Sequence, residues 1–511
     1  MTAPVDRSIL SSWHNSAVMK KTASSSQSVY RNQNVRIRAI FERASSSRKI
    51  LCVALDYAKR KHVALCCDGN GDILKEPFSV ENNAEGVAFL CEQVEATARR
   101  RKIEKETIFF GGEDQPSYVA NFVSALNDRG HLVARVNAYE ASEQRENLLA
   151  STDQLDLLSI AKTLLSRRAR LAGVCEGGDA IYGQMRELCR TRRSLVRQQT
   201  ATSNRIHTCV DQLFPGFLNS SKSGLTPFVG ASLSLMQDRF SAVEIARRRP
   251  VALANFLRRH HVHHPDETSG KILTLAQAAL PSVPDMVPAL QRSLRASAEL
   301  YACLKENAGQ LRLEAAQMLA STPYVMLTSI PGIAFTLAAG VAGELGDPRL
   351  LPRPDSLCAY AGIVPRVAQT GGPDSPPRHR STSPRHNHVL KDWVVQSSQK
   401  IALYGPPELK DRMIRWKANG QASVFAGARR YLRLLHCLVN NEVPYLAPTG
   451  RGGASTPQDQ AAACQQTWDI LVRKWRVVPG WQELLTDEKK PLGLWRRVVM
   501  ELHGIKLPTG L

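Results

Sequence analysis

Four carboxylates stand at positions from which a folded chain could present them together. Two follow short apolar runs that are typical of buried strands, and two are three residues apart on one face of a predicted helix: Asp56, Glu113, Asp153 and Asp156. Four carboxylates repel one another in a shared pocket unless cations neutralise them. Hard oxygen ligands favour Mg²⁺ or Mn²⁺. Two such ions close together stabilise the attacking and the leaving oxygen in phosphodiester chemistry, so this set predicts a metal site of that kind.

Each carboxylate also has a purely structural interpretation. Asp56 could simply end its strand in a turn, and Asp153 could complement the helix dipole in a first turn. Asp156 lies deeper in the apolar stretch Leu155–Ile160, where an unpaired charge is costly. Glu113 follows two glycines, which let other groups approach its strand closely. The metal-site hypothesis therefore depends on whether the surrounding elements bring the four together.

Three strands are predicted at the start of the first domain. Ile50–Asp56 and His62–Cys67 are separated by a short basic turn. The run Asp68-Gly69-Asn70-Gly71 is a strong turn signal, and a third strand is predicted over Ile73–Val80. Because short turns join neighbours in a sheet, these strands should form an antiparallel meander.

Helices and strands then alternate. Their predicted order is a helix (83–99), a strand (107–110), a helix (116–130), a strand (131–136) and a long helix from Ser151. Three meandering strands followed by this alternation give the order of the α/β ribonuclease-H-like fold, a mixed sheet covered by helices. In that fold the first and fourth strands are neighbours and the last helix crosses their face. The four carboxylates should therefore converge.

Composition indicates a polyanionic partner. Lys plus Arg exceed Asp plus Glu by 67 − 46 = 21, and the pI is about 9.7. Nucleic acid is the commonest partner of so basic a chain, with a membrane surface as the alternative. No apolar run approaches the length of a membrane span, and the first residues lack the charged-then-apolar layout expected of a secretory signal. The eleven cysteines lack CxxC spacing and predict reduced core residues, so we expect a cytoplasmic, nucleoid-associated protein.

Shifts in composition divide the chain into five parts. We expect a disordered basic arm (1–48), the α/β domain (49–166), a helical coiled-coil arm with an insert (167–322), a mainly α carboxy-terminal domain (323–446), and a linker with a helical tail (447–511). Two long helices joined by an insert predict an antiparallel hairpin, which could serve dimerisation, nucleic-acid clamping or both. Its basic first half holds three arginines predicted to contact nucleic acid: Arg190, Arg193 and Arg197.

Two segments of the carboxy-terminal domain predict contacts with phosphate. Ile330-Pro331-Gly332-Ile333 between two helical patterns suggests a helix-hairpin-helix turn whose amides, at Gly332, suit a phosphate. A tight corner between helices without a ligand is the alternative. The loop over residues 366–391 is expected to lie on a nucleic-acid backbone because it is so basic; its predicted contacts include Arg366, Arg378, Arg380 and Arg385.

Several of these segments resemble the DEDD insertion-sequence transposases, whose amino-terminal domain is similar to Holliday-junction resolvases of the RuvC type. The three acidic blocks are Val53–Asp56, Gly112-Glu113 and Thr152–Asp156. The carboxy-terminal half continues the resemblance through Leu327–Ile333, Glu344–Asp347, Tyr360–Pro365, Arg385–Leu390 and the late helix Ala426–Tyr445. The resemblance covers roughly residues 50–210 and 320–446, and leaves out the amino-terminal arm, the insert near 220–280 and the tail.

The resemblance implies a DNA transposase or recombinase that uses Mg²⁺ or Mn²⁺. It further implies a homo-oligomer, a dimer or tetramer, guided by a structured RNA that the element encodes. The family has a nucleophilic serine beside a Gly-Gly pair, and here Thr370 precedes Gly371 and Gly372. Ser375, Ser381, Ser383 and metal-activated water compete with Thr370 for that role. A nucleic-acid-binding derivative that no longer cuts, and a junction nuclease that needs only the carboxylates, are the alternative functions.

Overall fold

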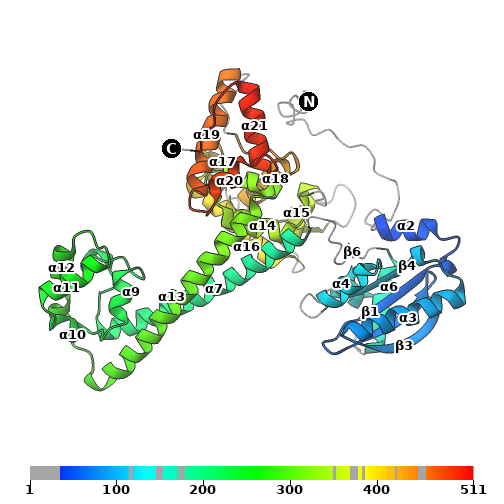
Figure 1. Ribbon diagram of the computed structural model, residues 1–511, viewed down its shortest axis with the longest axis horizontal. Helices are drawn as coiled ribbons and strands as arrows, with labels where there is room; N and C mark the ends of the chain where they lie inside the picture. The colour runs from blue at the N-terminus through cyan, green and yellow to red at the C-terminus, as the bar shows by residue number, and fades with distance from the viewer. Residues whose placement is uncertain are drawn as a thin grey trace. The chain divides into compact units, whose positions relative to one another are not determined.

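The computed structural model describes residues 35–113, 119–144, 153–167, 170–171, 179–348, 353–368, 378–382, 386–419, 423–446 and 456–509. The chain folds into two compact units, residues 1–176 and residues 177–511. The first unit contains a mixed sheet and its covering helices, and the second is mainly helical (Figure 1).

The sheet of the first unit has the strand order β3-β2-β1-β4-β5-β6. Its strands are β1 (Leu51–Asp56), β2 (Lys61–Asp68), β3 (Ile73–Glu81), β4 (Ile108–Glu113), β5 (Leu132–Val136) and the two-residue β6 (Arg170–Leu171). The first three pair antiparallel, whereas β1, β4 and β5 run parallel. This confirms the predicted meander and the mixed sheet of the ribonuclease-H-like fold.

Helices cover both faces of this sheet. On one face, α3 (Ala84–Arg101) and α4 (Ala120–Asp128) bury apolar side chains against Val53, Phe110 and Val133. On the other, α2 (Val35–Arg43), α5 (Ala138–Glu143) and α6 (Asp153–Leu165) pack against Cys52 and Phe109. The alternation of the strands assigns successive residues to opposite faces, so the sheet holds two separate cores. Asn83 caps α3 as predicted, because its side chain accepts a hydrogen bond from the Gly86 amide at 2.7 Å.

The amino-terminal arm differs from the expectation of disorder over its last residues. Val35–Arg43 forms helix α2, followed by the 3₁₀ turn η1 (Ser47–Lys49). Ile37 and Ile40 are buried in the core under α6, and their spacing of three residues places both on one helical face. The few apolar residues of the arm were therefore sufficient to dock one short helix. Residues 1–34 lie outside the described residues.

The second unit contains the predicted helical hairpin. Helix α7 (Asp179–Leu213) and helix α13 (Val287–Leu319) pack side by side over most of their length (Figure 1). Between them the chain forms a small helical head with its own apolar core: α8 (Ser220–Ser223), α9 (Ala231–Met236), α10 (Ala242–Ala246), α11 (Pro250–Arg259), α12 (Pro265–Ala278) and the 3₁₀ turn η3 (Pro284–Met286). The insert that lies outside the family resemblance is thus this head.

Helices also make up most of the rest of the second unit. They are the 3₁₀ helix η4 (Pro323–Ser329), α14 (Phe335–Leu345), α15 (Pro354–Tyr360), α16 (His388–Tyr404), α17 (Pro407–Ala418) and α18 (Ser423–Asn440), with the strands β7 (Pro365–Ala368) and β8 (Arg378–Thr382). The tail forms α19 (Pro457–Trp475), α20 (Trp481–Thr486) and α21 (Pro491–His503), of which α19 and α21 contact η4. Among the described residues, every helix is too short or too polar to cross a membrane.

Candidate active site and nucleic-acid interface

The sheet places Asp56 and Glu113 beside each other. Strands β1 and β4 are parallel, with Leu51 opposite Ile108 and Leu55 opposite Gly112. Asp56 and Glu113 are the next residues of the two strands and close both of them. Each carboxylate residue is half-buried. Backbone pairing alone therefore brings together two acidic residues that are 57 positions apart in the sequence.

Both residues belong to the face of the sheet that α6 covers. Alternate residues of a strand share a face, and Cys52 and Ala54 of β1 lie in the core with α6. Phe109 of β4 lies in the same core. Asp56 follows Ala54 by two residues and Glu113 follows Phe109 by four, so both belong to the face that α6 covers.

Two glycines of β4 permit this close packing. A side chain at Gly111 would meet Leu164 Cδ2 of α6 at 2.3 Å. A side chain at Gly112 would meet the Leu55 carbonyl oxygen of β1 at 2.4 Å. The glycine pair that precedes Glu113 therefore allows α6 and β1 to lie directly against β4, as the sequence predicted.

Helix α6 runs antiparallel to β1, and its first turn lies at the carboxylate end of the sheet. Leu165, its last residue, is close to Gly71 in the turn between β2 and β3. That turn adjoins the start of β1, because Leu51 pairs with Asp68. Thirteen helical residues span about 18 Å, the length of a six-residue strand, so α6 begins where β1 and β4 end.

The first turn of α6 supplies the other two predicted carboxylates. Asp156 is half-buried, and its backbone carbonyl accepts a hydrogen bond from Ser159 Oγ at 2.7 Å. Asp153 begins the helix. It precedes Leu157 by four residues and Ile160 by seven, so it lies on the same helical side as these two residues, which are buried against the sheet. The Asp153 side chain lies outside the described residues. All four predicted positions thus come from three elements that meet at one end of the sheet.

This arrangement fits a divalent cation in its donor chemistry, because every predicted ligand is a carboxylate oxygen. The fit does not extend to a complete side-chain cluster. Within the part of the chain that the structure describes, no three His, Cys, Asp or Glu side chains form a group able to hold a metal ion. A group of three that involved Asp153 falls outside that test.

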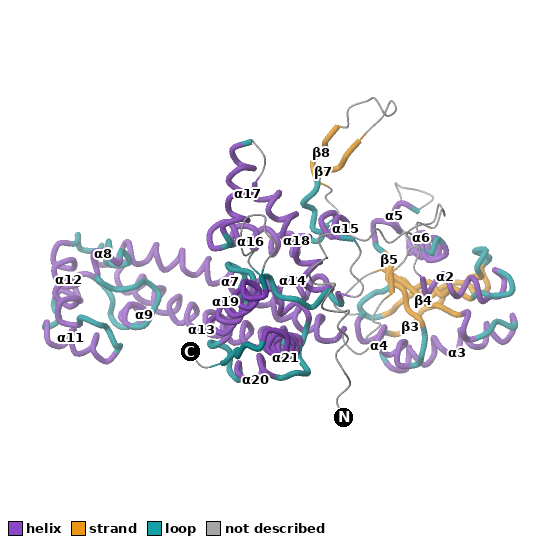
Figure 2. Tube along the Cα trace, turned by 90° about the horizontal axis from the view of Figure 1, so that it is seen from above, coloured by secondary structure: helices purple, strands orange, loops and turns teal. Residues whose placement is uncertain are grey.

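The predicted nucleophile loop lies between two paired strands of the second unit. Strand β7 pairs antiparallel with β8, with Arg366 opposite Arg380 and Ala368 opposite Arg378. Figure 2 shows the two strands side by side above α15. Thr370, Gly371, Gly372, Ser375, Ser383 and Arg385 lie outside the described residues, as do the side chains of Arg366, Arg378, Arg380 and Ser381. The backbone register alone places Arg366 opposite Arg380.

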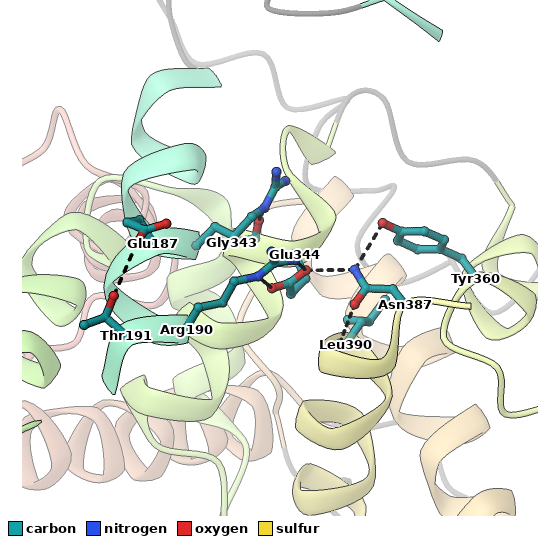
Figure 3. A network of polar contacts seen from close by, with 9 residues as sticks. Glu187, Arg190, Thr191, Gly343, Glu344, Tyr360, Asn387 and Leu390 are labelled. Atoms are coloured by element: carbon teal, nitrogen blue, oxygen red, sulfur yellow. Dashed lines mark hydrogen bonds and ion pairs between the residues drawn. The ribbon is translucent and has the colours of Figure 1, made fainter. Parts of the chain in front are cut away.

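Near the β7–β8 strand pair, several helices are joined through a buried carboxylate that was not among the predicted site residues. Glu344 of α14 is 2% exposed at its side chain. Arg190 of α7 donates two hydrogen bonds to it, at 2.7 and 2.9 Å, and Asn387 Nδ2 donates a third at 2.7 Å (Figure 3). Burial raises the pKa of the Glu344 carboxyl, but the hydrogen bonds from Arg190 and Asn387 outweigh it, and the pKa lies below its ordinary value.

Asn387 extends this network to two more elements. Its Oδ1 accepts a hydrogen bond from the Leu390 amide and so caps α16, while its Nδ2 donates to the Tyr360 hydroxyl at the end of α15 (Figure 3). Four helices, α7, α14, α15 and α16, are therefore joined through Glu344 and Asn387. Both residues occur in segments that resemble the transposase family, and this was the only signal in the sequence that could have identified them.

The arginines predicted to contact nucleic acid have different environments. Arg190 is bound to Glu344, and Arg193 forms an ion pair with Asp392 of α16. Arg186 donates to the Gly343 carbonyl at 2.7 Å. Arg197 is exposed and forms no ion pair with any described residue. Most of this row of arginines therefore holds α7 against α14 and α16.

The turn at Gly332 is also engaged within the unit. Gly332 has φ +89°, and a side chain there would meet the Lys400 carbonyl oxygen of α16 at 2.7 Å. Lys474 of the tail donates to the carbonyls of Thr328, Ile330 and Ile333 at 2.6, 2.7 and 2.7 Å. Burial lowers the pKa of Lys474 to about 7. No pattern in the sequence indicated that the tail would supply this contact.

The fold and the carboxylate end of its sheet define a ribonuclease-H-like enzyme domain of the DEDD type. Two families of known proteins match the chain, each described as transposases. The DEDD transposase family of IS110 elements matches residues 53–215, and the transposase family of IS116, IS110 and IS902 elements matches residues 324–413. The chain is therefore a DEDD transposase that belongs to the IS110 family, whose DEDD domain implies the use of a divalent metal ion and whose activity implies binding to DNA. No curated protein matches it significantly.

Proposed function

We propose that this transposase cuts and rejoins DNA strands with a metal site at the carboxylate end of the sheet and a hydroxyl nucleophile in the β7–β8 loop. The observation that carries the proposal is the meeting of β1, β4 and α6, which end or begin at Asp56, Glu113 and Asp153. Asp56, Glu113, Asp153 and Asp156 would hold Mg²⁺ or Mn²⁺. When bound, these ions neutralise the carboxylates and stabilise charge on the phosphate oxygens of the DNA.

Thr370 is the proposed nucleophile. Its hydroxyl oxygen forms a bond to the scissile phosphorus and loses its proton, while the bond to the departing strand's oxygen breaks and that oxygen takes up a proton. A free hydroxyl is a poor nucleophile at neutral pH, so it needs help from its surroundings. Gly371 and Gly372 allow the backbone to approach the phosphate, and arginines of β7 and β8 offset its charge: Arg366, Arg378 and Arg380.

The nucleic-acid partners follow from the same residues. DNA lies on the basic β7–β8 region, including Arg385, and on the exposed Arg197 of α7. Arg190 and Arg193 position this surface, because their ion pairs with Glu344 and Asp392 hold α7 against α14 and α16. Gly332 contributes by holding the turn before α14. We further propose that a structured RNA encoded by the element guides a dimer or tetramer of this chain to its target, at the nucleoid.

The experiment that tests the nucleophile traps a covalent protein–DNA adduct and maps the attached residue by mass spectrometry. An adduct on Thr370 is expected. Thr370→Ser should retain or improve cleavage, because it removes only a methyl that restricts χ1, and Thr370→Val should abolish it with nearly the same shape. An adduct on Ser375, Ser381 or Ser383 would overturn the assignment, and cleavage without any adduct would indicate water.

A further inference from the structure

Two arginines of the α7–α13 hairpin, Arg192 and Arg312, form no ion pair or side-chain hydrogen bond with the described residues. Arg192 of α7 and Arg312 of α13 are both half-buried, and the Nε atom of each is buried without a hydrogen-bond partner. Neither guanidinium forms an ion pair with a described residue. This separates Arg192 from its neighbours Arg190 and Arg193, whose guanidinium groups meet carboxylates.

The helical period explains the separation. Arg192 follows Cys189 by three residues and Met185 by seven, and both of these are buried. Arg190 and Arg193 lie on the side of α7 that contacts α14 and α16. Arg192 therefore belongs to the buried side of α7, where a cation needs a partner.

Among the described residues, the charged group that acts on Arg192 is another cation, Arg312. Burial lowers the pKa of Arg192, and the nearby charge of Arg312 lowers it further. The other titratable group beside it is the Cys189 thiol, and burial raises the pKa of that thiol to about 12, so it stays neutral at physiological pH. Two partly desolvated like charges are unfavourable in the protein alone and become favourable when an anion lies between them.

A further source of positive potential lies beside Arg312. Its guanidinium carbon is 5.5 Å from the ring centroid of Phe335, the first residue of α14. This cation–π contact places the guanidinium beside the start of α14. The first turn of α14 has no side-chain cap, so the positive end of its helix dipole adds to the positive potential near Arg312.

We propose that Arg192 and Arg312 form a binding site for a backbone phosphate of a nucleic acid. A guanidinium matches phosphate because its planar fork donates two parallel hydrogen bonds. The proposal rests on the proposed function, since the nucleic acid is the one that the transposase handles. The proposed phosphate contact lies on one side of α7, and the row of Arg190, Arg193 and Arg197 lies on another.

The test measures the salt dependence of binding to a duplex DNA oligonucleotide and, separately, to bulk transfer RNA as a structured RNA, without Mg²⁺. The double variant Arg192→Gln/Arg312→Gln should bind more weakly, with the log–log slope flattened by about 0.9 for each lost duplex phosphate contact. Replacing both arginines by lysine should restore most of the slope, because the charges remain. The matched control Arg205→Gln/Arg295→Gln removes two exposed arginines from the same two helices. It should change the slope less.

Thermal unfolding without nucleic acid distinguishes a binding role from a structural one. The Arg192→Gln/Arg312→Gln variant should unfold at the same or a higher temperature than the wild-type chain, since a repulsive pair is removed. A lower unfolding temperature, or unchanged slopes on both probes, would overturn the proposal. A flattened slope on only one probe identifies DNA or RNA as the source of the phosphate. Because no cleavage is measured, a wild-type chain that binds in this way but does not cut would overturn only the proposed function.

Discussion

Asp56 and Glu113 end adjacent parallel strands, one step beyond the register pair of Leu55 and Gly112, on the face that α6 covers. Nothing in the local sequence of either residue specifies this relationship. It arises because the chain forms β2, β3 and α3 before β4 returns beside β1 as its parallel neighbour. Under the proposed function, a divalent cation held by both carboxylates would offset the repulsion between them.

The first prediction concerns stability and Mg²⁺. Without the metal, Glu113→Gln should keep or raise the temperature of thermal unfolding, because it removes one of the repelling charges. Mg²⁺ at about a hundred times its dissociation constant should stabilise the wild-type chain by about 2.7 kcal/mol, and the variant by much less. Scanning calorimetry with and without Mg²⁺ measures both effects. Glu92→Gln, at an exposed position of α3, is the control. Equal stabilisation of all three proteins would exclude Glu113 as a ligand.

The two glycines of β4 should differ in their tolerance of a methyl group. Gly112→Ala places a Cβ 2.4 Å from the Leu55 carbonyl oxygen, which is backbone and has little freedom to move. Gly111→Ala meets the end of the Leu164 side chain at 2.3 Å, which has more freedom, and a backbone atom, the Ala134 carbonyl oxygen, only at 3.0 Å. Gly112→Ala should therefore lower the free energy of unfolding by about 1–3 kcal/mol, and Gly111→Ala should lower it less. Gly112→Ala should also impair cleavage, because Leu55 directly precedes Asp56. Urea denaturation that ranked the two variants in the opposite order would contradict this packing.

The Arg190–Glu344 pair predicts that the free energy of unfolding changes with pH in opposite directions in the wild-type chain and in Arg190→Met. In the wild-type chain the pKa of Glu344 lies below its ordinary value, so the pair's contribution is present at neutral pH and is lost as pH falls through the folded pKa. Arg190→Met leaves a buried carboxylate and should cost about 3 kcal/mol at pH 7. Burial should then raise the Glu344 pKa, so the variant should recover part of this loss as the pH falls to about 5. Arg197→Met, at an exposed position, should do neither.

Lys474 predicts a pH dependence on the alkaline side. Burial lowers its pKa to about 7, whereas an unfolded lysine titrates near about 10.4. Between these values the unfolded chain binds more protons than the folded one, so the free energy of unfolding should rise with pH from about 7 to 10. The three carbonyls around the ammonium group favour its charged form and limit the rise. Lys474→Met should lack this rise in chemical denaturation curves, and identical curves for the two proteins would contradict the prediction.

The sequence predicted the α/β unit well because its signals are local. Apolar runs identified β1 and β4, Asn83 identified the start of α3, and the two glycines before Glu113 indicated close packing. Face and neighbour relations then followed from strand alternation and from the order of the elements. The convergence of Asp56, Glu113 and the first turn of α6 could be inferred without coordinates for this reason.

The partners of the charged side chains could not be predicted in the same way. Arg190 and Glu344 are 154 residues apart, and no periodicity relates them. Composition indicated only that α7 is basic, whereas packing decides that Arg190 meets a carboxylate and Arg192 does not. Lys474 likewise lies in a tail without family resemblance, and its three carbonyl partners are backbone atoms whose identity leaves no trace in the sequence.

The central claim is that the carboxylates at the end of β1, at the end of β4 and in the first turn of α6 support metal-dependent DNA cleavage. The most direct test compares single-turnover strand cleavage by the wild-type chain and Asp56→Asn in Mg²⁺, with Glu76→Gln, an exposed residue of β3, as the control. Loss of a ligand should cost several kcal/mol of transition-state stabilisation, a decrease on the order of a thousandfold or more. Asp56→Asn should keep wild-type affinity for duplex DNA and its unfolding temperature without Mg²⁺, and Glu76→Gln should cleave normally. Undiminished cleavage by Asp56→Asn would contradict the account.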